Sequence, residues 1–282
     1  MTRRSILFAP GDRPERMHTA VDTGADAVVF DLEDAIAPDS RAEARERVRT
    51  VLSDLAAEPE VCVRVSPPGR GGAADLDAIL EAPPDALVLP KAEGAEDVTD
   101  LADLAVERGA DPPVLALVET AAGVLHAESV AAADPTDALL FGAEDLAADL
   151  GSSSTGDGTE LRHAREHVVL AATAGGVDAI DTVYTDFEDE AGLRQETAFA
   201  LGLGYDGKLA IHPAQVGPIN EAFTPDPERV AWARRVLDAR EKAEREGRAV
   251  FAVDGEMVDT PVIARAEQVI DRARAAGLSV DG

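Results

Sequence analysis

Short apolar runs alternate with longer amphipathic stretches along most of the chain. The runs are rich in Val, Leu, Ile and Ala and are too short for helices, so they predict strands. We expect strands over Ser5–Ala9, Ala27–Leu32, Val61–Val65, Ala86–Leu89, Val114–Val118, Ala138–Phe141, Ala179–Val183 and Leu209–Ile211. The stretches between and after them predict helices over Arg13–Thr23, Ser40–Leu55, Asp75–Leu80, Glu96–Glu107, Ala121–Ala131, Glu160–Ala174, Glu190–Leu201 and Pro213–Ala222.

Strands that alternate with helices predict a parallel sheet, and eight such units in a chain of 282 residues favour a closed barrel. We therefore expect an α/β fold, a (β/α)8 TIM barrel over residues 1–224. The tail breaks the pattern: it predicts a charged helix over Pro227–Arg245, a short hairpin over Gly247–Val258 and a helix over Pro261–Ala275. Residues 225–282 are thus expected to form a C-terminal helical arm.

The charge of the chain is extreme. With 26 basic and 55 acidic residues the formal net charge is −29, which argues against nucleic acid and anionic membranes as partners. The acidic residues are dispersed and Lys is scarce, which indicates a halophilic protein adapted to a salt-rich cytoplasm, where salt screens the repulsion. No signal sequence or long apolar span is evident, so we expect a cytoplasmic protein. The single cysteine, Cys62, lies in an alternating strand pattern and is expected to be a buried small hydrophobe.

Charged residues follow several predicted strands directly. Active sites of such barrels gather at the carboxyl ends of the strands, so these side chains are expected to converge on one face. One such residue alone would be better explained as a solvated loop charge or a helix cap. The set as a whole favours a site, and it comprises Asp31, Glu33, Asp34, Arg64, Lys91, Glu119, Glu144, Asp145 and His212.

Carboxylates from neighbouring strands suit a hard cation such as Mg²⁺, which often takes one or two protein carboxylates and keeps its other positions for water and substrate. An Arg beside them suits a bidentate contact with a substrate carboxylate. Zinc is disfavoured because the chain has no HExxH pattern. His163 and His167 are four residues apart on a predicted helix, and we interpret them as surface or packing residues.

Seven motifs in order resemble one family. They are Arg4-Ser5-Ile6-Leu7-Phe8-Ala9-Pro10-Gly11-Asp12-Arg13-Pro14, Val28-Val29-Phe30-Asp31-Leu32-Glu33-Asp34-Ala35, Val63-Arg64-Val65, Leu89-Pro90-Lys91, Val118-Glu119-Thr120, Gly142-Ala143-Glu144-Asp145-Leu146-Ala147-Ala148-Asp149-Leu150-Gly151 and Gly207-Lys208-Leu209-Ala210-Ile211-His212-Pro213-Ala214-Gln215-Val216. Together they resemble the citrate lyase β-subunit-like branch of the HpcH/HpaI aldolase superfamily, from Arg4 to about Arg265.

The resemblance implies a Mg²⁺ site at Glu119 and Asp145, with Arg64 holding the carboxylate of a 2-oxo acid. It also implies that Asp31, Glu33 and Asp34 support the substrate or the water shell of the metal. Lys91 is expected to support these groups and not to form a Schiff base.

The resemblance further implies that coenzyme A is seated by Arg13 and by the backbone around Ile211 and Pro213. Many relatives have a Lys where this chain has Thr19, so either the phosphates are expected to rest more on Arg13 and Arg16 or coenzyme A is expected to bind more weakly.

The segment Gly255-Glu256-Met257-Val258-Asp259-Thr260-Pro261 resembles the C-terminal signature of malyl-CoA and citramalyl-CoA lyases. This implies that Asp259 is a catalytic acid/base that reaches the barrel of a neighbouring subunit in a homo-oligomer, a trimer or hexamer. An exposed turn Asp that precedes a helix is the alternative.

The expected function is a Mg²⁺-dependent carbon–carbon lyase. It would cleave or form malyl-CoA, β-methylmalyl-CoA or citramalyl-CoA, from acetyl-CoA or propionyl-CoA and a 2-oxo acid such as glyoxylate or pyruvate. The alternatives are a citryl lyase subunit acting on an acyl-carrier protein, a malyl-CoA thioesterase, a CoA-independent 2-oxo acid aldolase and a non-catalytic acyl-CoA-binding protein.

Overall fold

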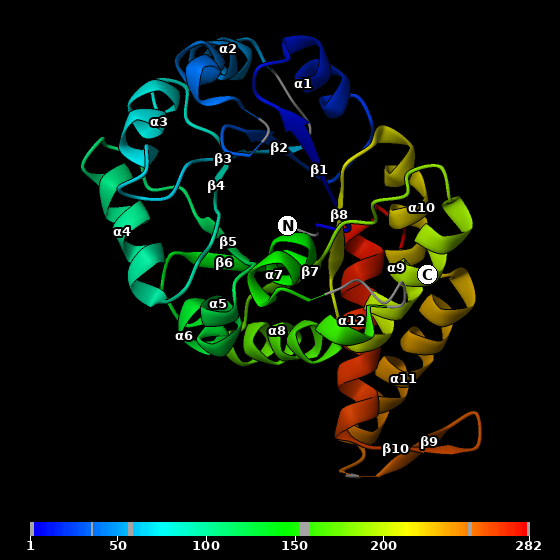
Figure 1. Ribbon diagram of the computed structural model, residues 1–282. Helices are drawn as coiled ribbons and strands as arrows, with labels where there is room; N and C mark the ends of the chain where they lie inside the picture. The colour runs from blue at the N-terminus through cyan, green and yellow to red at the C-terminus, as the bar shows by residue number, and fades with distance from the viewer. Residues whose placement is uncertain (1–2, 35, 56–58, 153–157, 248–249, 281–282) are drawn as a thin grey trace. The chain divides into compact units, whose positions relative to one another are not determined.

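A closed parallel barrel forms the larger part of the molecule (Figure 1). The computed structural model describes residues 3–34, 36–55, 59–152, 158–247 and 250–280. The barrel strands are β1 (Ser5–Pro10), β2 (Ala27–Asp31), β3 (Glu60–Arg64), β4 (Ala86–Leu89), β5 (Val114–Val118), β6 (Thr136–Phe141), β7 (Asp178–Asp181) and β8 (Gly207–Ala210). They follow one another in chain order, and β1 closes the sheet by pairing with β8 through Ser5 and Lys208. The predicted (β/α)8 barrel is confirmed.

Helices surround the strands. They are α1 (Pro14–Val21), α2 (Arg41–Asp54), α3 (Gly72–Ile79), α4 (Ala95–Val106), α5 (Ala121–Leu125), α6 (Ala127–Ala131), α7 (Ala143–Leu150), α8 (Arg162–Gly175), α9 (Glu190–Leu203) and α10 (Pro213–Phe223). Two short 3₁₀ helices, η1 (Pro38–Ser40) and η2 (Thr159–Leu161), lead into α2 and α8.

Two helical predictions need correction. The helix expected over Ala121–Ala131 is broken at His126, whose backbone (φ −118°, ψ 13°) leaves the helical region while its ring nitrogen bonds the carbonyl of Glu93 at 2.9 Å. Helix α7 was not predicted, because its Gly-Ala-Glu-Asp start resembles a loop and because Leu146 is the one buried residue among its eight.

The barrel interior is filled by side chains that point inward at every second strand position. They form one apolar cluster comprising Ile6, Ala27, Val29, Cys62, Ala86, Val88, Leu115, Leu117, Ala138, Leu140, Ile180 and Leu209. Cys62 is fully buried there, as expected, and burial raises the pKa of its thiol well above the usual value. This periodicity continues upward and decides which side chains reach the carboxyl-end mouth.

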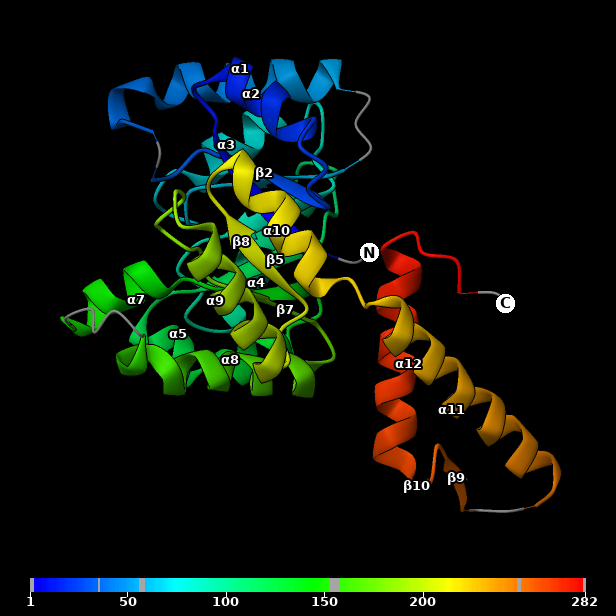
Figure 2. The same cartoon turned by 90° about the vertical axis from the view of Figure 1, so that its right-hand side faces the viewer.

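The chain divides into two compact units, Arg3–Asn220 and a C-terminal unit within Glu221–Gly282. The C-terminal unit contains α11 (Pro227–Arg245), the antiparallel strands β9 (Phe251–Val253) and β10 (Glu256–Val258), and α12 (Thr260–Ala275). Helices α11 and α12 lie side by side (Figure 2), and they share a small core that includes Val236, Ala266 and Ile270. In the described part of the chain, no helix combines the length and apolar character needed to cross a bilayer.

Candidate active site

A cavity of about 460 Å³ opens at the carboxyl end of the strands. Its floor and walls continue the inward-facing rows of the barrel core, two residues further along each strand. Polar side chains enter from the ends of β2 and β3, directly after β5 and β7, and from the start of α7, whereas β1 and β8 and the residues that follow them contribute apolar ones. The lining residues include Phe8, Pro10, Arg16, Asp31, Asp34, Arg64, Leu117, Glu119, Gly142, Ala143, Glu144, Asp145, Thr182, Val183, Leu209 and Ile211.

Arg64 lies at the centre of a buried ionic cluster on one wall. Its Nε and Nη2 donate to the two carboxylate oxygens of Asp31, both at 2.7 Å, and Nη1 lies 3.2 Å from Asp34 and 3.4 Å from Glu33. Its guanidinium also packs 5.3 Å from the ring centroid of Phe8. Burial opposes the charge, but the bonds to Asp31 and the nearby carboxylates raise the pKa of Arg64 overall. Arg64 is therefore a fixed cation that faces the cavity.

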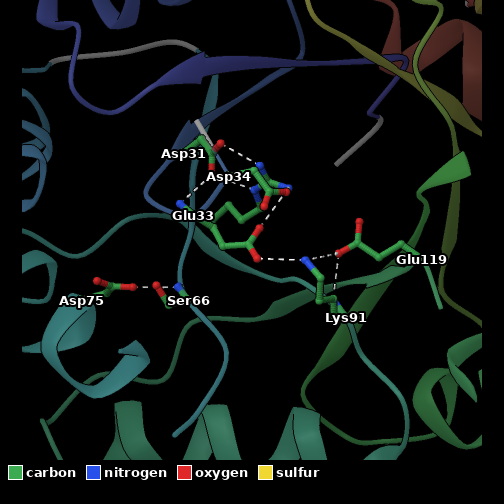
Figure 3. Close-up of polar contacts among 8 residues, drawn as sticks. Asp31, Glu33, Asp34, Ser66, Asp75, Lys91 and Glu119 are labelled. Carbon is green, nitrogen blue, oxygen red and sulfur yellow. Dashed lines mark hydrogen bonds and ion pairs between the residues drawn. The ribbon is translucent and has the colours of Figure 1, made fainter. Parts of the chain in front are cut away.

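Lys91 links this cluster to Glu119 (Figure 3). Its Nζ donates to Glu33 at 3.0 Å and lies 3.9 Å from Glu119 Oε1, while its backbone N–H donates to the same Oε1 at 3.0 Å. The backbone of Lys91 has φ 51°, a left-handed conformation that a non-glycine residue adopts at a cost of about 1–3 kcal/mol. These contacts join Lys91 to Glu33 and Glu119, and its supporting role stays a prediction.

Glu119 is 1% exposed and stands against the backbone of Gly142. A Cβ at Gly142 would lie 2.5 Å from Glu119 Cβ and 2.8 Å from Oε2, so only glycine fits there. Burial, and then the charge of Asp145, raise the pKa of Glu119 to about 8, although Lys91 and Arg64 act in the opposite direction. Glu119 thus lies in a buried position near the partly exposed carboxylate of Asp145, where negative charge exceeds what the protein neutralises.

These residues fit a hard divalent cation. Glu119 and Asp145 line one cavity, and their oxygen atoms are the ligands that Mg²⁺ prefers. Within the described ranges, no cluster of three or more His, Cys, Asp or Glu side chains is placed to hold a metal. A two-carboxylate site of this kind leaves most coordination positions to water and substrate, as Mg²⁺ commonly does.

A second cavity of about 300 Å³ adjoins the first and shares Phe8, Ala9, Pro10, Arg16 and Ile211 with it. It is completed by residues of β1, of α1 and at the start of α10, which are Leu7, Thr19, Ala20, His212 and Pro213. The predicted Ile211 and Pro213 lie here. Arg13 is among the lining residues of neither cavity and lies 3.6 Å from Asp12, whereas Arg16 lines both.

Asp259 belongs to the C-terminal unit. It is the N-cap of α12, where its carboxylate accepts a hydrogen bond from the backbone N–H of Val262 at 3.3 Å. Its side chain is exposed. The cap accounts for an Asp at this position locally, and the role of Asp259 in proton transfer stays a prediction.

Residue-type reasoning missed two positions. Thr182 lines the cavity from the end of β7, and Gly142 makes room for Glu119. The signal that could have found Thr182 is the two-residue period, since Ile180 faces the core and Thr182 follows on the same side. An uncharged hydroxyl at a strand end carries no compositional signal of its own.

Comparison with known proteins places the chain. The model of the HpcH/HpaI aldolase/citrate lyase family matches residues 4–213. The chain belongs to this family. It is 40% identical to the protein CitE from Mycobacterium tuberculosis, whose crystal structure in complex with magnesium, acetoacetate and coenzyme A superposes with a TM-score of 0.81 over 97% of this chain and 98% of that chain.

Two relatives of this chain have names that state different activities. It is 38% identical to the (3S)-malyl-CoA thioesterase of Cereibacter sphaeroides over 275 residues, which cover 96% of this chain and 95% of the relative. It is 34% identical to the mitochondrial citramalyl-CoA lyase of Rattus norvegicus, over 96% of this chain and 86% of the relative. Membership of the family therefore leaves the choice between carbon–carbon cleavage and thioester hydrolysis open.

Proposed function

We propose that the protein is a Mg²⁺-dependent lyase that makes or breaks the carbon–carbon bond of a short 3-hydroxyacyl-CoA. The observation that carries this proposal is the grouping of Glu119, Asp145 and Arg64 around one cavity. The buried carboxylate of Glu119 and the partly exposed one of Asp145 suit the metal, and the guanidinium beside them suits the carboxylate of glyoxylate or pyruvate. A protein that only bound acyl-CoA would have no need of the complete set.

Each residue has a distinct part in the proposed reaction. Glu119 and Asp145 would hold Mg²⁺, which when bound supplies Lewis-acid stabilisation of the negative charge that develops at the 2-oxygen. Arg64 would hold the substrate carboxylate, and Glu33 and Asp34 would keep Arg64 and the substrate oriented. Asp259 of a neighbouring subunit would remove a proton from acetyl-CoA or propionyl-CoA in condensation and return one in cleavage.

The second cavity is the proposed seat of the coenzyme A chain. Arg16 lies where the two cavities meet, so it can contact phosphate while the thioester extends toward Glu119. The backbone at Ile211 and Pro213 would border the pantetheine arm, and Arg13 would add charge at the surface. Thr19 brings no charge to this cavity.

We also propose a cytoplasmic homo-oligomer, a trimer or hexamer, in a salt-rich cell. The support is the net charge of −29 and the expected action of Asp259 in trans. Because salt screens repulsion among surface carboxylates, the melting temperature is expected to rise from 0.1 to 2 M KCl. Calorimetry over this range, with light scattering for the mass, tests both points, and a melting temperature that falls with KCl contradicts the adaptation to salt.

The decisive experiment offers malyl-CoA, β-methylmalyl-CoA and citramalyl-CoA to the protein with MgCl₂ in high KCl. The products to be measured are glyoxylate or pyruvate, acetyl-CoA or propionyl-CoA, and free CoA. We expect release of a 2-oxo acid that Asp145→Asn abolishes, while Asp149→Asn, a change on the same helix, retains it. Folded protein that releases no 2-oxo acid from any of the three substrates contradicts the proposal.

Thioester hydrolysis is the second candidate, favoured by the 38% identity to the (3S)-malyl-CoA thioesterase. The same site would direct water to the thioester carbonyl. Free CoA released together with malate, without glyoxylate and acetyl-CoA, would assign this activity.

A further inference from the structure

Thr182 lines the cavity directly after β7, and buried ion pairs hold the outer face of this strand end. The preceding residue, Asp181, faces outward, where it accepts two hydrogen bonds from Arg165 at 2.7 and 2.8 Å and one from Lys208 at 2.5 Å. Successive strand residues point to opposite faces, so Thr182 points inward above Ile180. It is 9% exposed. The buried ion pairs thus fix the position of its backbone.

The hydroxyl of Thr182 has one bond and one unused proton. Its Oγ1 accepts the backbone N–H of Ala143 at 3.2 Å, and a hydroxyl that accepts a bond can still donate one. Among the described residues no acceptor takes that proton. The branched Cβ restricts rotation about χ1, so the donor is held in one direction.

The surroundings of Thr182 differ from those of Arg64. In the closed eight-stranded barrel, β7 lies four strands from β3, on the opposite side of the cavity. The wall on one side of Thr182 is apolar, formed by Val183, Leu209 and Ile211. On its other side Thr182 meets Ala143, which Glu144 and Asp145 follow. Of the described side chains that line the cavity, Arg16, Arg64 and Thr182 carry hydrogen-bond donors in every ionisation state of the carboxyl groups, and Thr182 is the uncharged one. A neutral donor beside an apolar wall suits a neutral oxygen that gains charge during reaction.

We infer that the Thr182 hydroxyl donates a hydrogen bond to the thioester oxygen of the acyl-CoA. The inference rests on the proposed function, which assigns the substrate carboxylate to Arg64 across the cavity. When the carbon–carbon bond breaks, its electron pair passes into the thioester and its oxygen gains negative charge. The 3-hydroxyl loses a proton as it becomes the 2-oxo group, and the enolate carbon gains one, so protons balance. Thr182 stabilises that oxygen while the charge is present.

The test compares Thr182→Val, which keeps the shape and removes the hydroxyl, with Thr182→Ser, which keeps the hydroxyl. Titration calorimetry with MgCl₂ present measures the Kd of acetyl-CoA and that of free CoA, which lacks the acyl oxygen. Wild type should prefer acetyl-CoA, and Thr182→Val should weaken acetyl-CoA binding by about three- to tenfold with the Kd of CoA unchanged, since one neutral hydrogen bond is lost. The kcat of malyl-CoA cleavage should fall by roughly 10²-fold, because the oxygen is charged in the transition state. Thr182→Ser should stay near wild type in both.

Three outcomes overturn the inference. The first is a wild type that does not bind acetyl-CoA more tightly than CoA, and the second is a Thr182→Val protein whose preference is unchanged. The third is a parallel loss of Mg²⁺, CoA and acetyl-CoA binding in Thr182→Val, which would mean that the hydroxyl serves only to hold Ala143 and the start of α7. A wild type that binds acetyl-CoA but cleaves none of the three hydroxyacyl-CoA substrates would remove the proposed lyase function, while the ratio of Kd values would still decide the role of Thr182.

Discussion

Two groups of buried charges in the barrel are organised in opposite ways. Behind β7 and β8, Asp181 is fully buried yet receives hydrogen bonds from both Arg165 and Lys208, and Arg165 also bonds Glu196 at 3.0 Å. At the mouth, Glu119 receives one backbone N–H and has Lys91 Nζ only at 3.9 Å. In the first group the buried charges have partners of opposite sign. In the second group the carboxylates have too few positive charges beside them.

The difference indicates which group is built for binding. Buried charges are tolerated when they are paired, and an uncompensated carboxylate instead holds its proton or a metal. Burial lowers the pKa of Lys208 although Asp181 raises it, so burial destabilises the charged form even of a paired cation. Glu119, with its pKa raised to about 8, is the group whose energy a cation would improve. The balance of buried charge therefore distinguishes a structural ion cluster from a binding site, whatever the residue types are.

The sharpest way to break this contrast is Glu119→Gln. Loss of a metal ligand removes several kcal/mol of transition-state stabilisation, so we expect activity to fall by about 10³-fold or more. The metal-free protein should melt at a higher temperature than wild type at pH 8, because a buried charge is gone. Steady-state kinetics and calorimetry measure the two effects, and a variant that is inactive but also less stable would contradict the assignment of Glu119 as an uncompensated ligand.

In the structural cluster the same chemical change should act in the opposite direction. Asp181→Asn leaves Lys208 buried without its counter-charge and Arg165 with Glu196 alone, which is expected to cost about 3–5 kcal/mol of unfolding free energy. Urea unfolding followed by circular dichroism measures it. A loss below 1 kcal/mol would show that this cluster is as tolerant of charge removal as the surface.

The raised pKa of Glu119 makes metal binding depend on pH. Below pH 8 Mg²⁺ has to displace the proton, so its affinity should weaken by up to about tenfold, or 1.4 kcal/mol, for each pH unit lost between pH 8 and 5. Without metal, stability falls as pH rises from about 4.5 to 8, because the unfolded carboxyl ionises while the folded one keeps its proton.

Titration calorimetry of MgCl₂ at pH 6, 7 and 8.5 measures the affinity. Repeating it in two buffers of different ionisation enthalpy counts the protons released. Affinity that is constant over this range, with no proton released at pH 6, would contradict the pKa assignment.

The smallest effect is expected on α8, the helix that carries Arg165, on the face that is exposed to solvent. Arg162 and Glu166 form an ion pair at 2.9 Å with side chains 58% and 42% exposed. Glu166→Gln should change the unfolding free energy by no more than about 0.5 kcal/mol, because water and salt screen such pairs. The change in unfolding free energy for Glu166→Gln, measured under the same conditions as that for Asp181→Asn, is the reference value for the buried ion pair of Arg165. A change of several kcal/mol would mean that the buried and exposed ion pairs of this helix are equivalent.

Sequence reasoning reached most of the barrel because its strands are short apolar runs separated by amphipathic helices. It located Asp31, Arg64, Glu119 and Asp145 because charges directly after an apolar run are unusual, and the structure brings all four to one cavity. It did not reach Thr182, whose importance depends on the inward period of the strand and on a bond to Ala143 that joins two distant loops.

The break at His126 was missed for a related reason. No local signal in the pattern of Ala121–Ala131 ends a helix there, and the interruption depends on a contact with Glu93, 33 residues away. Sequence patterns record which face is apolar, whereas such contacts depend on which loops meet after folding. The same limit explains why α7, which carries Asp145, was taken for a loop.

The apolar cluster that fills the barrel has a consequence for how the ligand specificity of this fold could change. Side chains such as Leu115, Leu140 and Leu209 occupy the axis below the cavity, so a ligand cannot be accommodated by reaching deeper. The depth of the cavity is therefore fixed by the fold itself, and a larger ligand has to extend sideways, over the loops that follow β1 and β8. New specificity in this scaffold should arise by remodelling the rim, with the interior plug left untouched.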